Sequence, residues 1–456
     1  MKKTFLYLLL FFASATQAQD AVQIFLENKA LRHAQISFEL RDLSTNNTIV
    51  EYFSQTACTP ASVTKAITTA AALETLGADF RFQTKLTIDG TIDQDGTLQG
   101  NLCIIGGGDP TLGSRYFSNS DFVPAWMEAI RKAGIKKING AVYVDTSFYD
   151  QNPVPVLWLR EDAGNYYAAG VFPLSVFDNS YEIYVTSTAS AVTISNKTDY
   201  SFRNLLKIGT KDSIYISGEP FSQERTVYGT IRPHQSKTVK GDISNPPQYL
   251  AQYFSEKLRE NGIAVETDNY PALLTETIVI HTHFSLPLKN IAAMTNTFSI
   301  NNYAEHLLKY LARDTVRSFS GALQFERNLW ASKGIDMSGV FLYDGSGLSP
   351  ANAITAAFVC DVLSYMQGND DFRQSLPVAG ESGTVAGFLA ATPLKRKARV
   401  KSGSFRNVQC YAGYISQNNK DYAFCIMVNN FVGERKSVVK SIEQLLVNSL
   451  SATDSR

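Results

Sequence analysis

The chain has 456 residues, of which 44% are hydrophobic and 18% are charged. This composition is typical of a folded globular protein rather than a disordered one, and the length predicts two or three domains. Forty-two basic residues balance 42 acidic ones, which argues against broad electrostatic capture of nucleic acid or of an anionic membrane.

The first eighteen residues have the pattern of a secretory signal peptide. Lys2 and Lys3 precede a short apolar run from Phe5 to Phe12, and Thr16-Gln17-Ala18 offers small residues for cleavage after Ala18. The apolar run is too short to span a bilayer. We therefore expect a signal peptide over 1–18 and no transmembrane segment. The mature protein is expected to be exported, and either periplasmic or loosely associated with the cell envelope.

A helix is predicted to begin near Pro60 and to end at Gly77. Proline suits a first helical turn, Ala66–Leu76 is apolar, and glycine is a common stop signal. So apolar a helix is expected to be buried, with Ser62 at its positive end. Ser62 and Lys65 share one helical face, where the amine of the lysine can take the proton of the hydroxyl.

Residues 86–285 alternate short β-like runs with turn signals. The predicted strands are Thr84–Asp89, Asn101–Ile105, Gly140–Asp145, Ile183–Ser187, Val192–Ser195 and Ser213–Ser217. Two helices are predicted, at Asp121–Gly134 and at Pro246–Gly262. Residues 176–232 are rich in Ser, Thr and Tyr, so we expect a small nested β-rich domain there, within an inserted domain over 86–175 and 233–285.

The remainder, 21–85 joined to 286–456, is predicted to form one discontinuous catalytic domain. Helices are expected at 296–311 and 355–367, and 440–450 has an amphipathic helical pattern. Val400–Ser404, Val408–Ser416 and Tyr422–Asn429 are predicted to be successive antiparallel strands.

Three short motifs occur in order: Ser62-Val63-Thr64-Lys65, Ser299-Ile300-Asn301 and Lys401-Ser402-Gly403. Each is common alone, but together they are the signature set of penicillin-recognising serine acyl-enzymes. Four longer stretches add to the match, namely IGGGDPTL at 105–112, SINNYAE at 299–305, DGSGLSP at 344–350 and GESGT at 380–384. The chain resembles the class C low-molecular-mass penicillin-binding proteins, the D-alanyl-D-alanine carboxypeptidase/endopeptidase family of penicillin-binding protein 4.

This resemblance implies an α+β fold of the serine DD-peptidase/β-lactamase type, an antiparallel sheet with helices that carries inserted β-rich domains. It implies that Ser62 is the nucleophile, Lys65 the general base, and Ser299 with Lys401 the proton relay to the leaving amine. Asn301 would hold the substrate backbone. Backbone N–H groups of Ser62 and Ser404 would form the oxyanion hole.

The implied substrates are peptidoglycan stem peptides ending in D-Ala-D-Ala and their crosslinks, with β-lactams as covalent inhibitors. The strand Lys401-Ser402-Gly403-Ser404 would line the site and bind the C-terminal carboxylate. Asp145 resembles a residue of a family block near the substrate entrance, where it could pair with a cationic or amide-bearing third stem residue. Alternatively, Asp145 merely caps the turn after a strand. Neither acylation nor deacylation requires a metal or an organic cofactor.

The chain departs from the family pattern at three places. Ser402 stands where threonine is usual, and Ile300 stands where aspartate or asparagine is common. The family also tends to carry an arginine shortly after its D-G-T block, whereas Gly383-Thr384 is followed by Val385-Ala386. One substrate contact is therefore not accounted for.

Two alternative functions share the fold. A serine β-lactamase needs a base for fast hydrolysis of the penicilloyl ester, and the sequence contains no identifiable acidic loop that supplies one. A non-enzymatic cell-wall binding protein would usually have lost at least one motif residue, and all of them are present.

Several weaker patterns favour structural roles. Gly106-Gly107-Gly108 lacks the Gly-Lys-Ser/Thr of a phosphate loop, so a turn is expected. His281 and His283 share one strand face without an evident third ligand, and Ser346 lacks a G-x-S-x-G elbow. The five cysteines are too irregularly spaced for a disulfide framework or a zinc site, although one disulfide could form. They are Cys58, Cys103, Cys360, Cys410 and Cys425.

Overall fold

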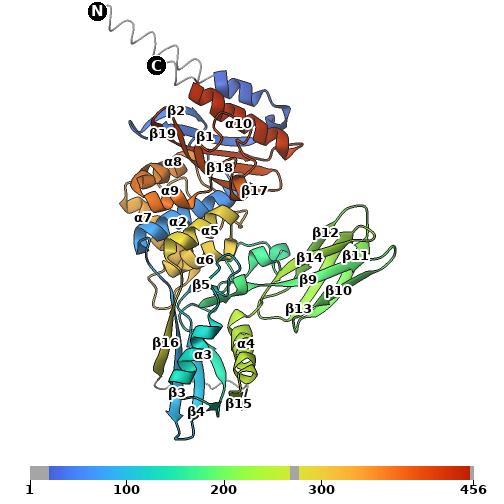
Figure 1. Ribbon diagram of the computed structural model, residues 1–456. Helices are drawn as coiled ribbons and strands as arrows, with labels where there is room; N and C mark the ends of the chain where they lie inside the picture. Colours follow the sequence, from blue (N-terminus) through green and yellow to red (C-terminus); the bar gives the residue numbers. More distant parts are fainter. Residues whose placement is uncertain (1–19, 268–276, 452–456) are drawn as a thin grey trace, which may run out of the picture. The chain divides into compact units, whose positions relative to one another are not determined.

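The computed structural model describes residues 20–267 and 277–451 (Figure 1). They group into two compact units. The first unit contains residues up to Asp79, Leu288–Ile300 and the residues from Ala322 onward, and the second contains Phe80–Pro287 and Asn301–Gly321. Residues 301–321 therefore group with the inserted part, whereas the sequence places them in the catalytic domain. The finer division into catalytic, inserted and nested domains remains a prediction.

The first unit is built on a five-stranded antiparallel sheet in the order β17-β18-β19-β1-β2. The three predicted C-terminal strands are confirmed, each slightly longer than expected. The strand bounds are β1 Gln35–Asp42, β2 Asn47–Tyr52, β17 Ala398–Phe405, β18 Val408–Gln417 and β19 Lys420–Asn429.

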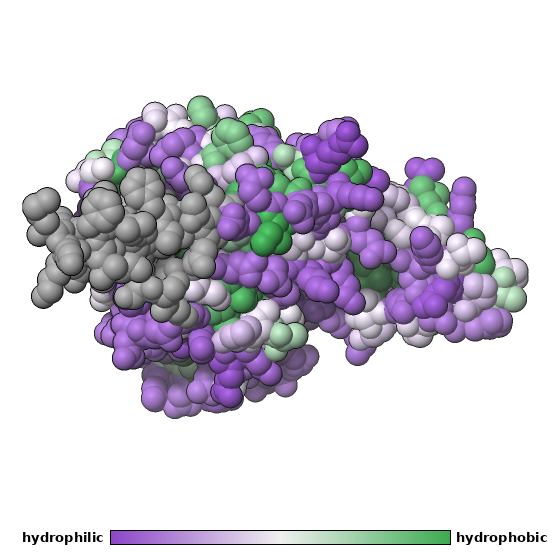
Figure 2. Space-filling view, turned by 90° about the horizontal axis from the view of Figure 1, so that it is seen from above, coloured by the Kyte–Doolittle hydropathy of each residue, from purple (hydrophilic) through white to green (hydrophobic). Residues whose placement is uncertain are grey.

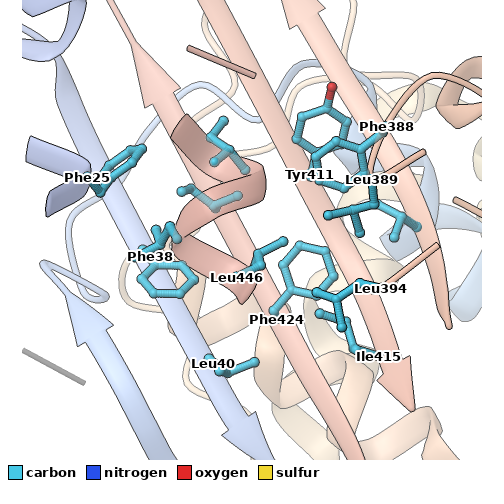
Figure 3. Close-up of a cluster of buried hydrophobic side chains, with 14 of the residues drawn as sticks. Phe25, Phe38, Leu40, Phe388, Leu389, Leu394, Tyr411, Ile415, Phe424 and Leu446 are labelled. Atoms are coloured by element: carbon cyan, nitrogen blue, oxygen red, sulfur yellow. The ribbon is translucent and has the colours of Figure 1, made fainter. Parts of the chain in front are cut away.

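Alternating residues of β1 face two different layers. Phe38 and Leu40 point into an apolar core that also contains Phe424 and Leu446 (Figure 3). Leu446 belongs to α10 (Arg435–Ser451), the amphipathic helix predicted around 440–450. Glu39 and Arg41 point to the other face, where Arg41 pairs with Asp361 of α8 (Ala356–Tyr365) at 2.6 Å. The sheet thus has helices on both faces.

Helix α2 (Thr64–Leu76) follows a short 3-10 turn at Ala61–Val63 and ends at Gly77, whose φ is +81°. Ten consecutive residues of α2, from Thr64 to Leu73, are buried. The predicted buried helix with Ser62 at its N-terminal end is therefore confirmed. The other helices of this unit are α5 (Leu288–Phe298), most of α7 (Phe319–Ser332) and α9 (Asp370–Ser375).

The predicted continuous helix over 296–311 is wrong, because the chain breaks at Ser299. Helix α5 ends at Phe298, and Ser299 adopts a left-handed conformation with φ +58°. The Ile300 N–H then donates to the Thr295 carbonyl at 3.1 Å, the bond of a Schellman C-cap. A new helix, α6 (Asn301–Tyr310), begins at the next residue. Glycine usually occupies such a position and would signal the end of a helix. Serine stands there instead, so the sequence does not indicate the break.

The second unit contains a six-stranded sheet in the order β15-β6-β4-β3-β16, with β7 also paired to β4. Helices α3 (Val123–Lys132) and α4 (Pro246–Glu260) pack their apolar residues onto it, among them Trp126 and Phe254. Both helices were predicted. The strand bounds are β3 Gln83–Ile92, β4 Thr97–Ile105, β6 Lys137–Ile138, β7 Val142–Asp145, β15 Ala264–Val265 and β16 Ile278–Phe284.

Two three-stranded sheets, β10-β9-β14 and β11-β13-β12, share a separate small core in the second unit. Buried Arg225 pairs with Asp242 at 2.9 Å beneath them. A fourth sheet of this unit has two strands and joins β5 (Asp109–Leu112) to β8 (Leu174–Val176), and the Gly106–Gly108 segment connects β4 to β5. The remaining strands are β9 Ser180–Ser187, β10 Val192–Asn196, β11 Ser201–Ile208, β12 Ser213–Ser217, β13 Glu224–Ile231 and β14 Ser236–Asp242.

Hydrophilic residues predominate on the face seen in Figure 2, and hydrophobic residues occur there in small groups. Within 20–267 and 277–451, no helix combines the length and the hydrophobicity needed to cross a bilayer. The signal peptide expected over 1–18 lies outside the described residues. All five cysteines lie within them, and each is buried with a free thiol.

Candidate active site

Ser62 lies in the 3-10 turn that leads into α2, and Lys65 lies in the first turn of the helix itself. The Lys65 side chain is fully buried, and its Nζ donates to Ser62 Oγ at 3.0 Å. Ala61, directly before the serine, has φ +47°. A non-glycine residue in this region is strained and must be held by its surroundings. The structure therefore presents the serine hydroxyl to an amine, as the sequence predicts.

The loop Asp344–Ser349 provides the second partner of Lys65. Lys65 Nζ donates to the Ser346 carbonyl at 2.6 Å, and Thr68 Oγ1 donates to the Gly345 carbonyl at 2.8 Å. Gly347 has φ +76°, and a Cβ there would lie 1.9 Å from the Ala61 carbonyl oxygen. The loop therefore packs directly against the turn that carries the nucleophile.

Asp344 holds this loop in shape. Its carboxylate accepts hydrogen bonds from the Gly347 N–H at 2.8 Å, the Ser349 N–H at 2.6 Å and the Asn352 side-chain amide at 2.7 Å. All four residues named here lie in or beside the DGSGLSP stretch. The stretch therefore does more than border the site, because its Ser346 carbonyl contacts Lys65 directly.

Ser299 and Lys401 form a second hydroxyl–amine pair. Lys401 lies on β17, is fully buried, and donates from Nζ to Ser299 Oγ at 3.0 Å and to the Ser402 carbonyl at 2.7 Å. Burial, and then the nearby charge of Lys65, lower the pKa of the Lys401 amine well below its usual range. Two lysines that repel each other in this way belong to one site. A neutral amine there can accept and pass on a proton.

Strand β17 approaches the nucleophile turn at Gly403. A Cβ on Gly403 would lie 2.4 Å from the Pro60 carbonyl oxygen and 2.9 Å from the Ser62 nitrogen, so only glycine fits. Ser402 Oγ donates to Thr384 Oγ1 at 2.8 Å, which joins the strand to the GESGT stretch. Ser404, the next residue, has an exposed side chain. Hydroxyl groups thus line the end of the strand beside Lys401.

Asn429, which the sequence analysis did not single out, fixes the segment before Ser62. Its Oδ1 accepts from the Thr59 N–H at 2.7 Å, and its Nδ2 donates to the Thr59 carbonyl at 3.1 Å. The Cys410 thiol donates to the same carbonyl at 3.4 Å. Asn429 lies at the end of β19 without a motif around it, so no pattern in the sequence could have found it.

Asn301 and Asp145 belong to the second unit, and each has a partner there. Asn301 Nδ2 donates to the Tyr167 carbonyl at 2.7 Å. Asp145 ends β7, and its Oδ1 accepts from the Ser147 N–H at 2.8 Å. This hydrogen bond is the one expected if Asp145 caps the turn after the strand, which is the alternative to a role in substrate binding. Among the described side chains, no group of three or more His, Cys, Asp or Glu has a geometry that could hold a metal ion.

Comparison with known proteins gives consistent results. Residues 18–452 match the D-Ala-D-Ala carboxypeptidase 3 (S13) family. The chain is 28% identical over 452 residues to a D-alanyl-D-alanine carboxypeptidase of Actinomadura sp. strain R39, covering 92% of this chain and 82% of the relative. It is 25% identical over 447 residues to the D-alanyl-D-alanine carboxypeptidase DacB of Haemophilus influenzae, covering 91% and 90%.

Among solved structures, penicillin-binding protein 4 (dacB) from Haemophilus influenzae is similar with a TM-score of 0.81 and 24% identity. That match covers 95% of this chain and 99% of the other. The same protein complexed with a β-lactam gives a TM-score of 0.75. Together with the antiparallel sheet and its helices, these matches confirm the α+β fold with additional β-rich parts that the sequence predicts.

The close approach at Gly403 predicts that Gly403→Ala is damaging. The added Cβ must push β17 away from Pro60 and Ser62, and a misplacement of about 1 Å can cost about a hundredfold in rate. We expect the rate of labelling by a fluorescent penicillin to fall at least about tenfold, while the protein stays folded by circular dichroism. Gly368→Ala is the control, because a Cβ there meets nothing within 4 Å. Equal labelling rates in the two variants would contradict the prediction.

Proposed function

The chain belongs to the D-Ala-D-Ala carboxypeptidase 3 (S13) family, and from this premise we propose that Ser62 is the nucleophile of its serine peptidase reaction. One observation carries the proposal, namely the pairing of two serine hydroxyls with two buried lysine amines. Ser62 Oγ lies 3.0 Å from Lys65 Nζ, and Ser299 Oγ lies 3.0 Å from Lys401 Nζ. The substrate class is peptidoglycan stem peptides ending in D-Ala-D-Ala, and D-alanyl crosslinks.

Acylation begins when the Lys65 amine, acting as the general base, takes the Ser62 proton. The serine oxygen then attacks the carbonyl carbon of the D-Ala-D-Ala bond. The tetrahedral intermediate collapses as the C–N bond breaks, and the proton that Lys65 took reaches the leaving amine through Lys401 and Ser299. The lowered pKa of Lys401 suits this step, because a neutral amine can relay a proton whereas an ammonium ion can only give one up.

Backbone N–H groups of Ser62 and Ser404 are proposed to stabilise the oxyanion. Gly403 supports this assignment, because it brings the strand that carries Ser404 against the Ser62 backbone. Ser402, Ser404 and Lys401 are proposed to bind the substrate carboxylate, with Gly403 providing the close approach between them. The arginine common in the family is absent, and buried Val385 follows Thr384 instead, so the carboxylate contacts rest on hydroxyls and on Lys401.

Water attack on the acyl-enzyme completes the cycle and releases the shortened stem peptide and a free Ser62. β-Lactams are proposed to acylate the same serine. Asn301 is proposed to hold the substrate backbone. Cleavage after Ala18, export, and a periplasmic or envelope-associated location are likewise proposed, on the grounds of the N-terminal pattern.

Replacement of the nucleophile is the direct test of this site. Ser62→Ala should abolish covalent labelling by fluorescent penicillin and release of D-alanine from a stem peptide, because no oxygen remains to form the ester. Mass analysis of a peptic digest should place the label of the wild-type protein on Ser62. Ser332→Ala, at the exposed end of α7, is the control. Label on another serine, or label that persists in Ser62→Ala, overturns the assignment.

The two lysines should differ in what they contribute. Lys65→Ala should slow acylation by roughly a thousandfold for every substrate, because the base is lost. Lys401→Ala should slow substrates with a free carboxylate more than their esters, because the hydrogen bond from the Lys401 amine to the ionised carboxylate is lost only for the former. Acylation rates for acid and ester pairs of one substrate measure the difference. Exposed Lys397, just before β17, supplies the control Lys397→Ala. An equal loss on acid and ester rules out carboxylate binding by Lys401.

Asp145 is proposed to contact the third stem residue. Asp145→Ala should lower hydrolysis of natural stem peptides and leave penicillin acylation unchanged. Asp95→Ala is the matched control, since Asp95 Oδ1 accepts from the Thr97 N–H at 3.1 Å in the same kind of turn. If the two variants lose thermal stability alike and keep the same activity on stem peptides, Asp145 is only a turn cap.

A further inference from the structure

Glu326 of α7 is a buried acid that no part of the proposed reaction uses. Its side chain is 1% exposed, and within the described residues neither of its carboxyl oxygens has a hydrogen-bond partner. Leaving an ionised carboxylate in this state is very unfavourable. Glu39, an equally buried acid in the same unit, is paired with Arg41 at 2.7 Å. Glu326 therefore requires a different explanation from an ordinary buried ion pair.

The charged group that acts on Glu326 is Asp344. Burial, and then the negative charge of Asp344, raise the pKa of the Glu326 carboxyl to about 8. The Asp344 carboxyl accepts three hydrogen bonds, whereas the Glu326 oxygens accept none among the described residues, so the interior favours the protonated form of Glu326. Arg327, the neighbouring residue on α7, offers no compensation, since its guanidinium donates to the carbonyls of Met337 and Val340 at 3.0 Å.

Asp344 connects this acid to the acyl-transfer site. Its carboxylate shapes the loop whose Ser346 carbonyl accepts from Lys65 Nζ at 2.6 Å. The same loop places Gly347 against the Ala61 carbonyl, one residue before Ser62. An ionised Glu326 would add a second buried negative charge that repels Asp344, and this repulsion would destabilise the loop that Asp344 shapes. Any displacement of the loop would therefore move the hydrogen-bond partner of the Lys65 amine and the contact with the turn that carries Ser62.

We propose that Glu326 is a positioning residue of this site, and that the Asp344 loop stays seated against Lys65 only while the Glu326 carboxyl is uncharged. Loss of that proton sets a second buried negative charge against that of Asp344 and loosens the loop. Acylation then slows at alkaline pH. The proposal rests on the proposed function for its activity readout, and it adds a proton-dependent support behind the general base.

The free energy of unfolding should also depend on the proton of Glu326. The pKa of Glu326 rises from 4.5 to about 8 on folding, so the folded protein holds the proton more tightly than the unfolded chain. The free energy of unfolding contributed by this group therefore falls as pH rises from about 4.5 to about 8. Glu326→Gln imitates the protonated acid and cannot ionise, so its melting temperature should decline less over that interval.

The decisive experiment measures the second-order rate of penicillin acylation from about pH 6 to about pH 10 in the full-length wild-type protein and in Glu326→Gln. Glu128→Gln, an exposed glutamate on α3, is the control. All other titrating groups of the site are common to the three proteins, so only the difference between the pH profiles of the proteins reports on Glu326. Near neutral pH the rates should agree within about twofold, and at the alkaline end Glu326→Gln should be at least about threefold faster.

Superimposable pH profiles for wild type and Glu326→Gln overturn the proposal. If Glu326→Gln does not fold, infrared spectra of wild-type protein labelled with ¹³C-glutamate provide the test. A protonated-carboxyl band that disappears well above pH 4.5, in parallel with the acylation rate, supports the proposal, and the absence of such a band overturns it. Failure of the proposed function is distinguishable, because then Ser62 takes no label at any pH while the infrared and melting readouts remain.

Discussion

Two lysine amines buried close to one another are the constraint on which the rest of the site depends. Lys65 and Lys401 are both fully buried, and a low-polarity interior cannot hold two ammonium ions side by side at little cost. Each amine is instead given a hydroxyl and a carbonyl as partners. Burial lowers the pKa of Lys401 and so favours its uncharged form, whose lone pair is free for proton transfer. The packing of the fold and the chemistry of this amine therefore have one physical origin.

Backbone geometry, rather than side-chain chemistry, brings these partners together. Ala61 and Ser299 adopt left-handed conformations that are unfavourable for residues with a Cβ. Gly347 and Gly403 allow the loop and the strand to touch the nucleophile turn, where any side chain would collide with main-chain atoms. Asn429 then holds Thr59 by both its N–H and its carbonyl. The surrounding structure thus stabilises a local geometry that is unfavourable by itself.

Much of this was visible in the sequence, for identifiable reasons. The buried helix α2 and the strands β17 to β19 follow from apolar patterns and stop signals that depend on neighbouring residues only. The break at Ser299 was missed, because serine gives no sign of a left-handed conformation that tertiary contacts impose. Glu326 and Asn429 lie outside every motif, and their roles depend on partners distant along the chain. Residues 301–321 group with the second unit because of how they pack, and no local sequence pattern indicates this packing.

The five cysteines carry a practical consequence. Each thiol is buried, and burial raises the pKa of Cys58 to about 12 and that of Cys103 to about 11, so the reactive thiolate is scarce at neutral pH. None of the five described cysteines forms a disulfide bond in the folded protein, and the buried thiols are poor targets for maleimides. A single cysteine introduced on the surface can therefore be modified selectively, which makes the wild-type sequence a ready background for attaching spin labels or fluorophores.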